Sequence, residues 1–158
     1  MKRVFLLIAV ALLTVVASSV YAQNDAIVGT WKLNTAKSKF DPGPAPKSLT
    51  RTVVADGDGV KYTFEGVSAD GKPVTYGFAA HFDGKDNPIM GSMPSGADTI
   101  SAKRVDANHY VATLKKGGKV IGTSKVSISK DGKETTVQSS GTNAAGVKSH
   151  DVQVYDKQ

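Results

Sequence analysis

The sequence predicts an all-β protein, a single antiparallel up-and-down β-barrel of about 8–10 strands. Two observations lead to this prediction. Short windows in which apolar and polar residues alternate recur along residues 23–158, and a period of two is the pattern of a half-buried strand. Between these windows lie Asp-Gly, Gly-Gly and Asp-Gly-Lys turns, which adopt the positive φ angles of tight hairpins at little cost.

The alternation is strongest at Val60–Glu65, where Val60, Tyr62 and Phe64 fall on one face of the expected strand. Val74–Phe82 continues the same pattern. The other expected strands are Ile27–Asn34, Ser48–Ala55, Thr99–Val105, His109–Lys115, Val120–Ser129, Glu134–Ser140 and Lys148–Tyr155. Because short turns such as Asp83-Gly84-Lys85 join them, consecutive strands are expected to form hairpins. A sheet of about nine such strands would close into a barrel to remove its edges.

Two stretches do not fit a strand. Thr35–Lys47 holds three prolines and is expected to be an extended linker across one end of the barrel, because proline lacks the N–H donor and restricts the residue before it. Asp86–Ala97, with Met90 and Met93, is expected to be irregular as well. Its methionines would either fill gaps or line the mouth of the barrel.

Residues 1–22 have the pattern of a signal peptide. Met1-Lys2-Arg3 is basic, the apolar run Val4–Val16 follows, and Ala22 provides a small residue for cleavage. The alternative is an uncleaved membrane anchor, but a spanning helix needs about 20 apolar residues. We therefore expect residues 23–158 to form one periplasmic or secreted barrel domain, with no stable membrane insertion after cleavage.

Composition excludes several partners and chemistries. The formal net charge is +6 and the chain has no Cys, which excludes a disulfide scaffold, a thiolate zinc site and a catalytic thiol. The basic residues are mostly dispersed lysines rather than clustered arginines, so no nucleic-acid partner is expected.

The sequence also predicts no enzyme. His81, His109 and His150 share no metal-ligand spacing, and no Gly-x-Ser-x-Gly nucleophile motif or glycine-rich phosphate loop is present. We expect no metal, no cofactor and no catalytic residue. The alternative is an isomerase or cyclase in which His150 and a tyrosine act as acid and base.

The residues in the inward phase would form the barrel interior. They are Trp31, Leu33, Val60, Tyr62, Phe64, Val74, Tyr76, Phe78, Phe82, Ile100, Tyr110, Leu114, Val126, Ile128, Val152 and Val154. Among them Tyr62, Phe64, Tyr76, Phe78 and Tyr110 are candidate ligand-binding residues, since inward tyrosine hydroxyls need hydrogen-bond partners that a ligand can supply.

Three titratable residues share this inward phase: Arg51, Arg104 and His150. A buried charge is costly unless it is paired. One arginine would therefore anchor the carboxylate or phosphate of an amphipathic ligand. The structural alternative is that each arginine lies at a rim or pairs with an acidic neighbour, which for Arg104 would be Asp98 or Asp106.

Gly29-Thr30-Trp31, inside the first expected strand, resembles the Gly-x-Trp of the lipocalin-like (calycin-type) proteins. The resemblance implies structural roles for Gly29 and Trp31, with Trp31 closing one end of a barrel that holds a small apolar ligand. The chain lacks that family's Thr-Asp-x-x-Tyr motif and its C-terminal arginine against the tryptophan, and Lys148 is the nearest cation that would substitute for this arginine.

Two further likenesses bear on the fold. Ile27–Leu33 is similar to the opening of the intracellular fatty-acid-binding proteins, whose two helices after the first strand do not fit the proline-rich Thr35–Lys47. The Asp-Gly-Lys turns, the proline-rich crossing and the closing Val-Tyr-Asp-Lys also resemble small exported bacterial proteins.

Together these features predict an exported, non-catalytic binding protein that holds a small hydrophobic or amphipathic molecule in a β-barrel. Trp31 would close one end, and Met90–Pro94 would lie at the more open end. The alternative is a solid barrel that acts through the loops Phe40–Pro46 and Pro88–Ser95 as a periplasmic interaction protein or protease inhibitor. No particular protein partner follows from the sequence.

Overall fold

The computed structural model describes residues 25–142 and 146–158, and the expected signal peptide lies outside these residues. The strands are β1 (Gly29–Leu33), β2 (Ser48–Asp56), β3 (Gly59–Val67), β4 (Pro73–Ala80), β5 (Asp83–Pro88), β6 (Met90–Gly91), β7 (Thr99–Arg104), β8 (His109–Lys116), β9 (Lys119–Ile128), β10 (Glu134–Thr142) and β11 (Lys148–Lys157). Within the described ranges no helix is long and apolar enough to cross a membrane.

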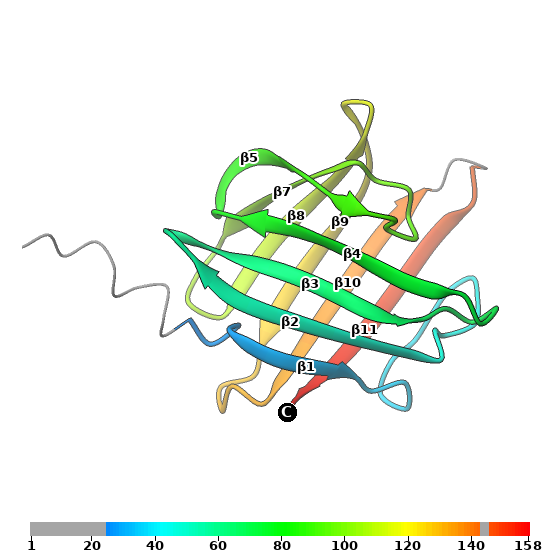
Figure 1. Cartoon of the computed structure of the whole chain (residues 1–158), viewed down its shortest axis with the longest axis horizontal. Coiled ribbons are helices and arrows are strands. Elements are labelled where there is room, and N and C mark those ends of the chain that lie inside the picture. Colours follow the sequence, from blue (N-terminus) through cyan, green and yellow to red (C-terminus); the bar gives the residue numbers. More distant parts are fainter. Residues whose placement is uncertain (1–24, 143–145) are drawn as a thin grey trace, which may run out of the picture.

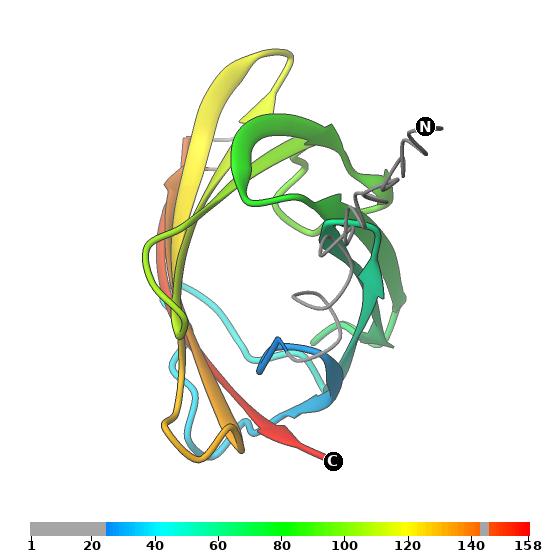
Figure 2. The same ribbon diagram turned by 90° about the vertical axis from the view of Figure 1, so that its left-hand side faces the viewer.

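All the strands belong to one sheet, in the order β5-β7-β8-β9-β10-β11-β1-β2-β3-β4-β6, and all the strand pairs are antiparallel. β2, β3 and β4 form one wall in front of β8–β11 (Figure 1), and the sheet curls round into a near-closed ring (Figure 2). The predicted all-β up-and-down barrel is confirmed.

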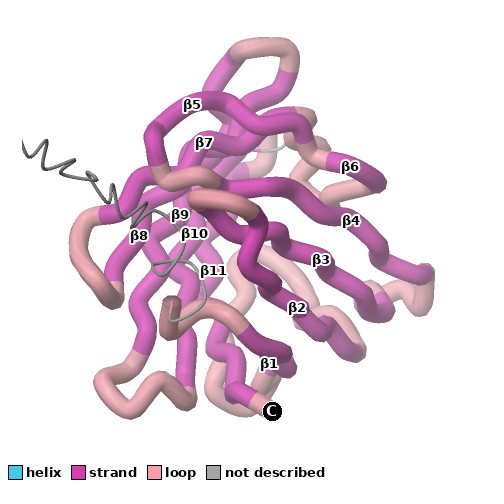
Figure 3. Tube along the Cα trace, turned by 60° about the vertical axis from the view of Figure 1, so that its left-hand side comes forward, coloured by secondary structure: helices cyan, strands magenta, loops and turns pink. Residues whose placement is uncertain are grey.

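The gap in the barrel between β4 and β7 is bridged by the connecting segment that contains β5 and β6, because β4 and β7 do not pair directly. β5 pairs with β7, and β6 pairs with β4 through Tyr76–Gly91 and Gly77–Met90. β6 accordingly runs beside β4 while β5 runs beside β7 (Figure 3). The region Asp86–Ala97, expected to be irregular, therefore supplies part of two short strands.

The expectation of a hairpin turn at Asp83-Gly84-Lys85 was wrong, because these residues form the start of β5. Phe82 takes a φ of 56°, so the chain reverses just before this triplet, and Asp83–Lys85 lies within β5. The register between β5 and β7 shifts between Asp83 and Asp86, as in a β-bulge, which accommodates the positive φ of Gly84. The other expected strands are confirmed, with ends that differ by one or two residues.

One end of the barrel is closed by the turn before β1, which we call the closed end. The Val28 N–H donates to the Asp25 carbonyl at 2.9 Å, and Ile27 is fully buried. The Trp31 indole Nε1 donates to the Ile27 carbonyl at 2.8 Å. The chain therefore crosses the base of the barrel before it enters the sheet (Figure 2).

The expected inward phase is confirmed for most strands and is wrong for β11. Tyr155 pairs with Leu33 of β1 and with Thr135 of β10, both of which are buried. Odd-numbered residues of β11 therefore face inward, and His150, Val152 and Val154 face outward. Val154 is buried outside the core cluster, because residues 34–41 pair along the edge of β11.

Candidate functional site

An aromatic row lines the inner face of β3 and β4. Tyr62 pairs with Phe78 and Phe64 pairs with Tyr76 across the ladder, and all four side chains are buried. The ring centroids lie 4.8 Å apart in the first pair and 4.5 Å apart in the second, with planes inclined by 27° and 9°. Because strand side chains stand roughly perpendicular to the sheet, rings stacked on one another point their edges into the barrel.

Arg51 lies next to this row on the inner face of β2. It pairs with Trp31 of β1 and with Phe64 of β3, and only 2% of its surface is exposed. The guanidinium carbon lies 5.2 Å from the centre of the Trp31 ring and 4.6 Å from that of Tyr155. Both rings stabilise the cation through their π faces.

The Arg51 guanidinium has unused hydrogen-bond donors. Nε and Nη2 are buried without a hydrogen-bond partner, and in the described part of the chain no carboxylate forms an ion pair with Arg51. Burial lowers the pKa of Arg51, yet an arginine starts far enough above neutrality to stay charged. An unpaired buried cation of this kind is strongly unfavourable.

The tyrosines around Arg51 add neutral donors. Burial raises the pKa of Tyr62 to about 12 and that of Tyr155 to about 12, and it raises the pKa of Tyr76 further. All three phenols therefore stay protonated at neutral pH. The Tyr155 hydroxyl donates to the Gln153 side chain at 2.7 Å, whereas within residues 25–142 and 146–158 the Tyr62 and Tyr76 hydroxyls make no hydrogen bond.

Arg104, the other arginine of the described chain, is paired. Its guanidinium forms an ion pair with Asp25, whose side chain is 5% exposed, and donates to the Tyr110 hydroxyl at 3.0 Å. Tyr110 in turn donates to Asp25 at 2.8 Å, and burial raises its pKa. The acidic partner is thus Asp25 rather than Asp98 or Asp106, because the turn before β1 brings it to the ends of β7 and β8.

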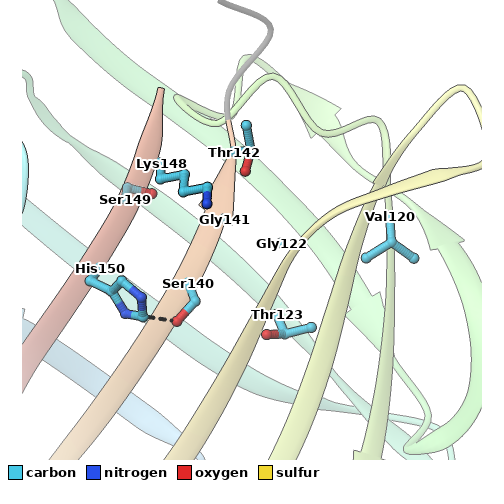
Figure 4. A pocket seen from close by; sticks show the side chains of 9 residues that line it. All are labelled: Val120, Gly122, Thr123, Ser140, Gly141, Thr142, Lys148, Ser149 and His150. Atoms are coloured by element: carbon cyan, nitrogen blue, oxygen red, sulfur yellow. Dashed lines mark hydrogen bonds between the residues drawn. The ribbon is translucent and has the colours of Figure 1, made fainter. Parts of the chain in front are cut away.

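His150 does not join the inward residues. Its Nδ1 lies 3.0 Å from the Ser140 Oγ on the outer face of β10 and β11. With Thr123 and Lys148 these side chains line an open hollow of about 290 Å³ (Figure 4). The expected inward position of His150 is therefore wrong, because the register of β11 differs by one residue from that expected.

Trp31 is buried at the closed end, and the cation beside Trp31 and Gly29 is Lys157 rather than Lys148. The Lys157 ammonium lies 5.0 Å from the centre of the Trp31 ring and donates to the Ala26 carbonyl at 3.1 Å. Gly29 has a φ of 137°, and a Cβ there would lie 2.7 Å from Lys157 Cε. Glycine therefore leaves room for the lysine stem.

A second inner wall faces the barrel from β8–β11, and the sequence did not indicate its polar row. The ladders place Ala112, Ser124, Ser139 and Asp151 in one row on this wall. All four remain half-buried, although they point inward. These side chains therefore keep part of their surface accessible on the inner face of this wall.

Among the described residues no group of three or more His, Asp or Glu side chains is placed to hold a metal ion. His81 and His109 are exposed and lie 2.8 Å from the carboxylates of Asp58 and Asp106. The hydrogen bond to His81 is the main cause of the lowered pKa of Asp58. These two histidines therefore lie at surface turns, away from the inner walls.

No family model matches the chain, and no curated protein matches its sequence. Several solved structures are similar in fold. Zebrafish ileal bile acid-binding protein complexed with cholic acid has a TM-score of 0.51 and 15% identity, over 84% of this chain and 99% of that one. The redesigned β-barrel mFAP1 bound to DFHBI has a TM-score of 0.46 and 13% identity, over 86% and 97% of the two chains.

Lobster apocrustacyanin A1 has a TM-score of 0.44 and 12% identity, over 85% of this chain and 62% of its own. The similarity to the zebrafish protein, at a TM-score of 0.51, shows a common fold. The chain therefore has the same antiparallel β-barrel fold as this bile acid-binding protein.

Proposed function

We propose that the protein is an exported, non-catalytic binding protein that holds an amphipathic molecule with an anionic head group inside its barrel. One observation carries this proposal. Arg51 is a buried cation with two guanidinium nitrogens, Nε and Nη2, that have no hydrogen-bond partner, and it has no acidic partner in the described chain. A carboxylate or phosphate would accept hydrogen bonds from the planar guanidinium and neutralise its charge.

The surroundings of Arg51 favour an anion with an apolar body. The Tyr62 and Tyr76 phenols remain protonated donors because burial raises their pKa values. The edges of the stacked rings carry the positive end of the aromatic quadrupole, which also favours negative charge. Leu49, Val53 and Phe64 beside them offer apolar contact.

The same geometry supports binding rather than catalysis. The phenols nearest Arg51 hold pKa values far above neutrality, so they are poor proton donors or acceptors at neutral pH. His150 lies on the outer wall beside Ser140, away from them. The zebrafish protein of the same fold was solved with cholic acid, which supports a ligand in a barrel of this kind.

Two further parts of the proposal, a ligand inside the barrel and export of the protein, rest on other residues. The half-exposed inner side chains Ala112, Ser124 and Ser139 favour an interior with room for a ligand over a filled barrel that acts through its loops. Export is supported by the basic start, apolar run and small-residue cleavage site of residues 1–22.

Two matched probes test the anionic anchor: the fluorescent fatty acid cis-parinaric acid and its uncharged methyl ester. We expect Arg51→Met to weaken binding of the acid by about 10- to 100-fold, since charge-assisted hydrogen bonds are lost. Binding of the ester should change little. Lys61→Met, which removes a charge from the outer face of β3, is the matched control and should leave both affinities unchanged.

Equal affinity of the unaltered protein for acid and ester would contradict the proposal. So would an Arg51→Met variant that keeps the affinity for the acid while its circular dichroism and Trp31 fluorescence show a native fold.

A further inference from the structure

A polar row crosses the inner wall opposite the aromatic row. Ala112 of β8 pairs with Ser124 of β9, Ser124 pairs with Ser139 of β10, and Ser139 pairs with Asp151 of β11. Directly paired residues of antiparallel strands project their side chains to the same face, about 5 Å apart. We call Ser124, Ser139 and Asp151 the hydroxyl row.

The hydroxyl row has hydrogen-bonding capacity to spare. The Oγ atoms of Ser124 and Ser139 lie 2.9 Å apart, so one donates to the other. The Asp151 Oδ1 accepts from the Asp41 N–H at 3.0 Å, while its Oδ2 has no hydrogen-bond partner within residues 25–142 and 146–158. All three side chains are half-buried and within reach of a molecule in the interior.

The rows on either side differ sharply from it. Towards the closed end the next pair is Val126 and Val137, which pack against the core. Towards the opposite end the next pair is Gly122 and Gly141, which project no side chain into the barrel. The hydroxyl row therefore lies between the valine pair and the glycine pair, and the Leu114 side chain lies 3.6 Å from where a Cβ at Gly122 would be.

We propose that the hydroxyl row recognises a hydroxyl group on the ligand, so that the ligand class is the amphipathic carboxylates that carry a hydroxyl on their apolar body. This inference rests on the proposed function of the barrel. A ligand hydroxyl is both donor and acceptor: it donates to the free Asp151 oxygen and accepts from a serine.

A plain acyl chain is discriminated against at the same row. It would remove water from Ser124, Ser139 and Asp151 without returning a hydrogen bond, and unpaired polar groups of this kind penalise the wrong ligand. Asp151 also repels a carboxylate, whereas Arg51 attracts one. The two charges therefore direct the head group to Arg51 and the hydroxylated part to the opposite wall.

The test compares stearate with its 10-hydroxy and 12-hydroxy derivatives by titration calorimetry. We expect at least one hydroxylated acid to bind the unaltered protein about tenfold more tightly than stearate, as one additional satisfied hydrogen bond implies. In the Ser124→Ala, Ser139→Ala double variant this ratio should fall towards one. Ser140→Ala, the same change one residue along on the outer face, should leave the ratio intact.

The outcomes separate the two proposals. If stearate and both hydroxylated acids bind equally and the binding depends on Arg51, the inference is overturned while the proposed function stands. If none of the three binds the unaltered protein, the proposed function fails and the inference fails with it. A preference for a hydroxylated acid that persists in the double variant, or in Ser139→Ala alone if the double variant does not fold, also overturns the role of the row.

Discussion

The Lys157 ammonium lies 5.0 Å from the centre of the Trp31 ring and donates a hydrogen bond to the Ala26 carbonyl at 3.1 Å. One side chain near the end of the last strand thus joins the first strand and the turn that closes the barrel. Trp31 is fully buried, so the contact is partly shielded from solvent. Cation–π contacts and hydrogen bonds to charged groups are both strengthened by such shielding.

Replacing Lys157 should therefore destabilise the barrel. We expect Lys157→Met to lower the free energy of unfolding by about 1–2 kcal/mol, from the lost cation–π contact and hydrogen bond. Urea denaturation followed by the fluorescence of Trp31, the one tryptophan of the chain, measures the change. Lys125→Met, on the exposed outer face of β9, is the control, and an equal effect of both substitutions would refute this role.

The ion pair of Asp25 with Arg104 predicts a second stability effect. Asp25→Asn would leave Arg104 and Tyr110 without their charged partner at the closed end. We expect a loss of about 2 kcal/mol, reduced from the value for a fully buried pair because Arg104 is partly exposed. Asp58→Asn, at an exposed pair with His81, should change stability by much less. Comparable losses in the two variants would mean that Asp25 does not fix the turn.

The buried phenols predict alkaline unfolding. Burial raises the pKa of Tyr62 and Tyr155 from 10.0 to about 12, so the folded state holds these protons more tightly than the unfolded state does. Their stabilising contribution is complete below pH 10 and is lost as the pH rises through about 12. Tyrosinate absorbance should appear together with the loss of native circular dichroism. Ionisation of Tyr62 and Tyr155 near pH 10 with the fold intact would contradict this.

Thr135 predicts a stabilising substitution. Its side chain is fully buried and its Oγ1 has no hydrogen-bond partner in the structure. Thr135→Val keeps the branched shape and removes the unsatisfied hydroxyl, so we expect the stability to rise by about 1 kcal/mol. Thermal melting measures the change, with Thr136→Val on the opposite face of β10 as the comparison. A lower melting temperature for Thr135→Val would show that the hydroxyl is satisfied in solution.

Much of the barrel could be predicted because its strands alternate cleanly. Tyr62, Phe64, Tyr76 and Phe78 were assigned to one face by their period of two, and the ladder of β3 with β4 confirms it. Arg51 was assigned to the interior in the same way. Local patterning is sufficient here because each of these strands buries one face and exposes the other.

The phase of β11 could not be predicted in this way. Val152 and Val154 give an apolar alternation on one face, while Gln153 and Tyr155 occupy the other. The choice is made by pairing with Leu33 and Thr135, which are distant in the sequence. A one-residue error in phase moves every side chain to the opposite face, and this places His150 outside the barrel.

The polar residues that pair with Arg104 and Trp31 also could not be predicted from the local sequence pattern. Asp25 and Lys157 lie outside the expected strands, and their contacts with Arg104 and Trp31 depend on closure of the whole sheet. The hydroxyl row was missed because serines give no hydrophobic signal. Only its phase relative to Val126 and Ile128 could have indicated that it faces inward.

The most direct test of the anionic anchor is native mass spectrometry of the protein purified from its own source, alongside the Arg51→Met variant prepared identically. We predict that the unaltered protein retains a stoichiometric small molecule whose extract contains a carboxylate or phosphate, and that the variant has lost it. An uncharged molecule retained equally by both proteins would contradict the account. So would a ligand-free mass for the unaltered protein that persists after incubation with amphipathic acids.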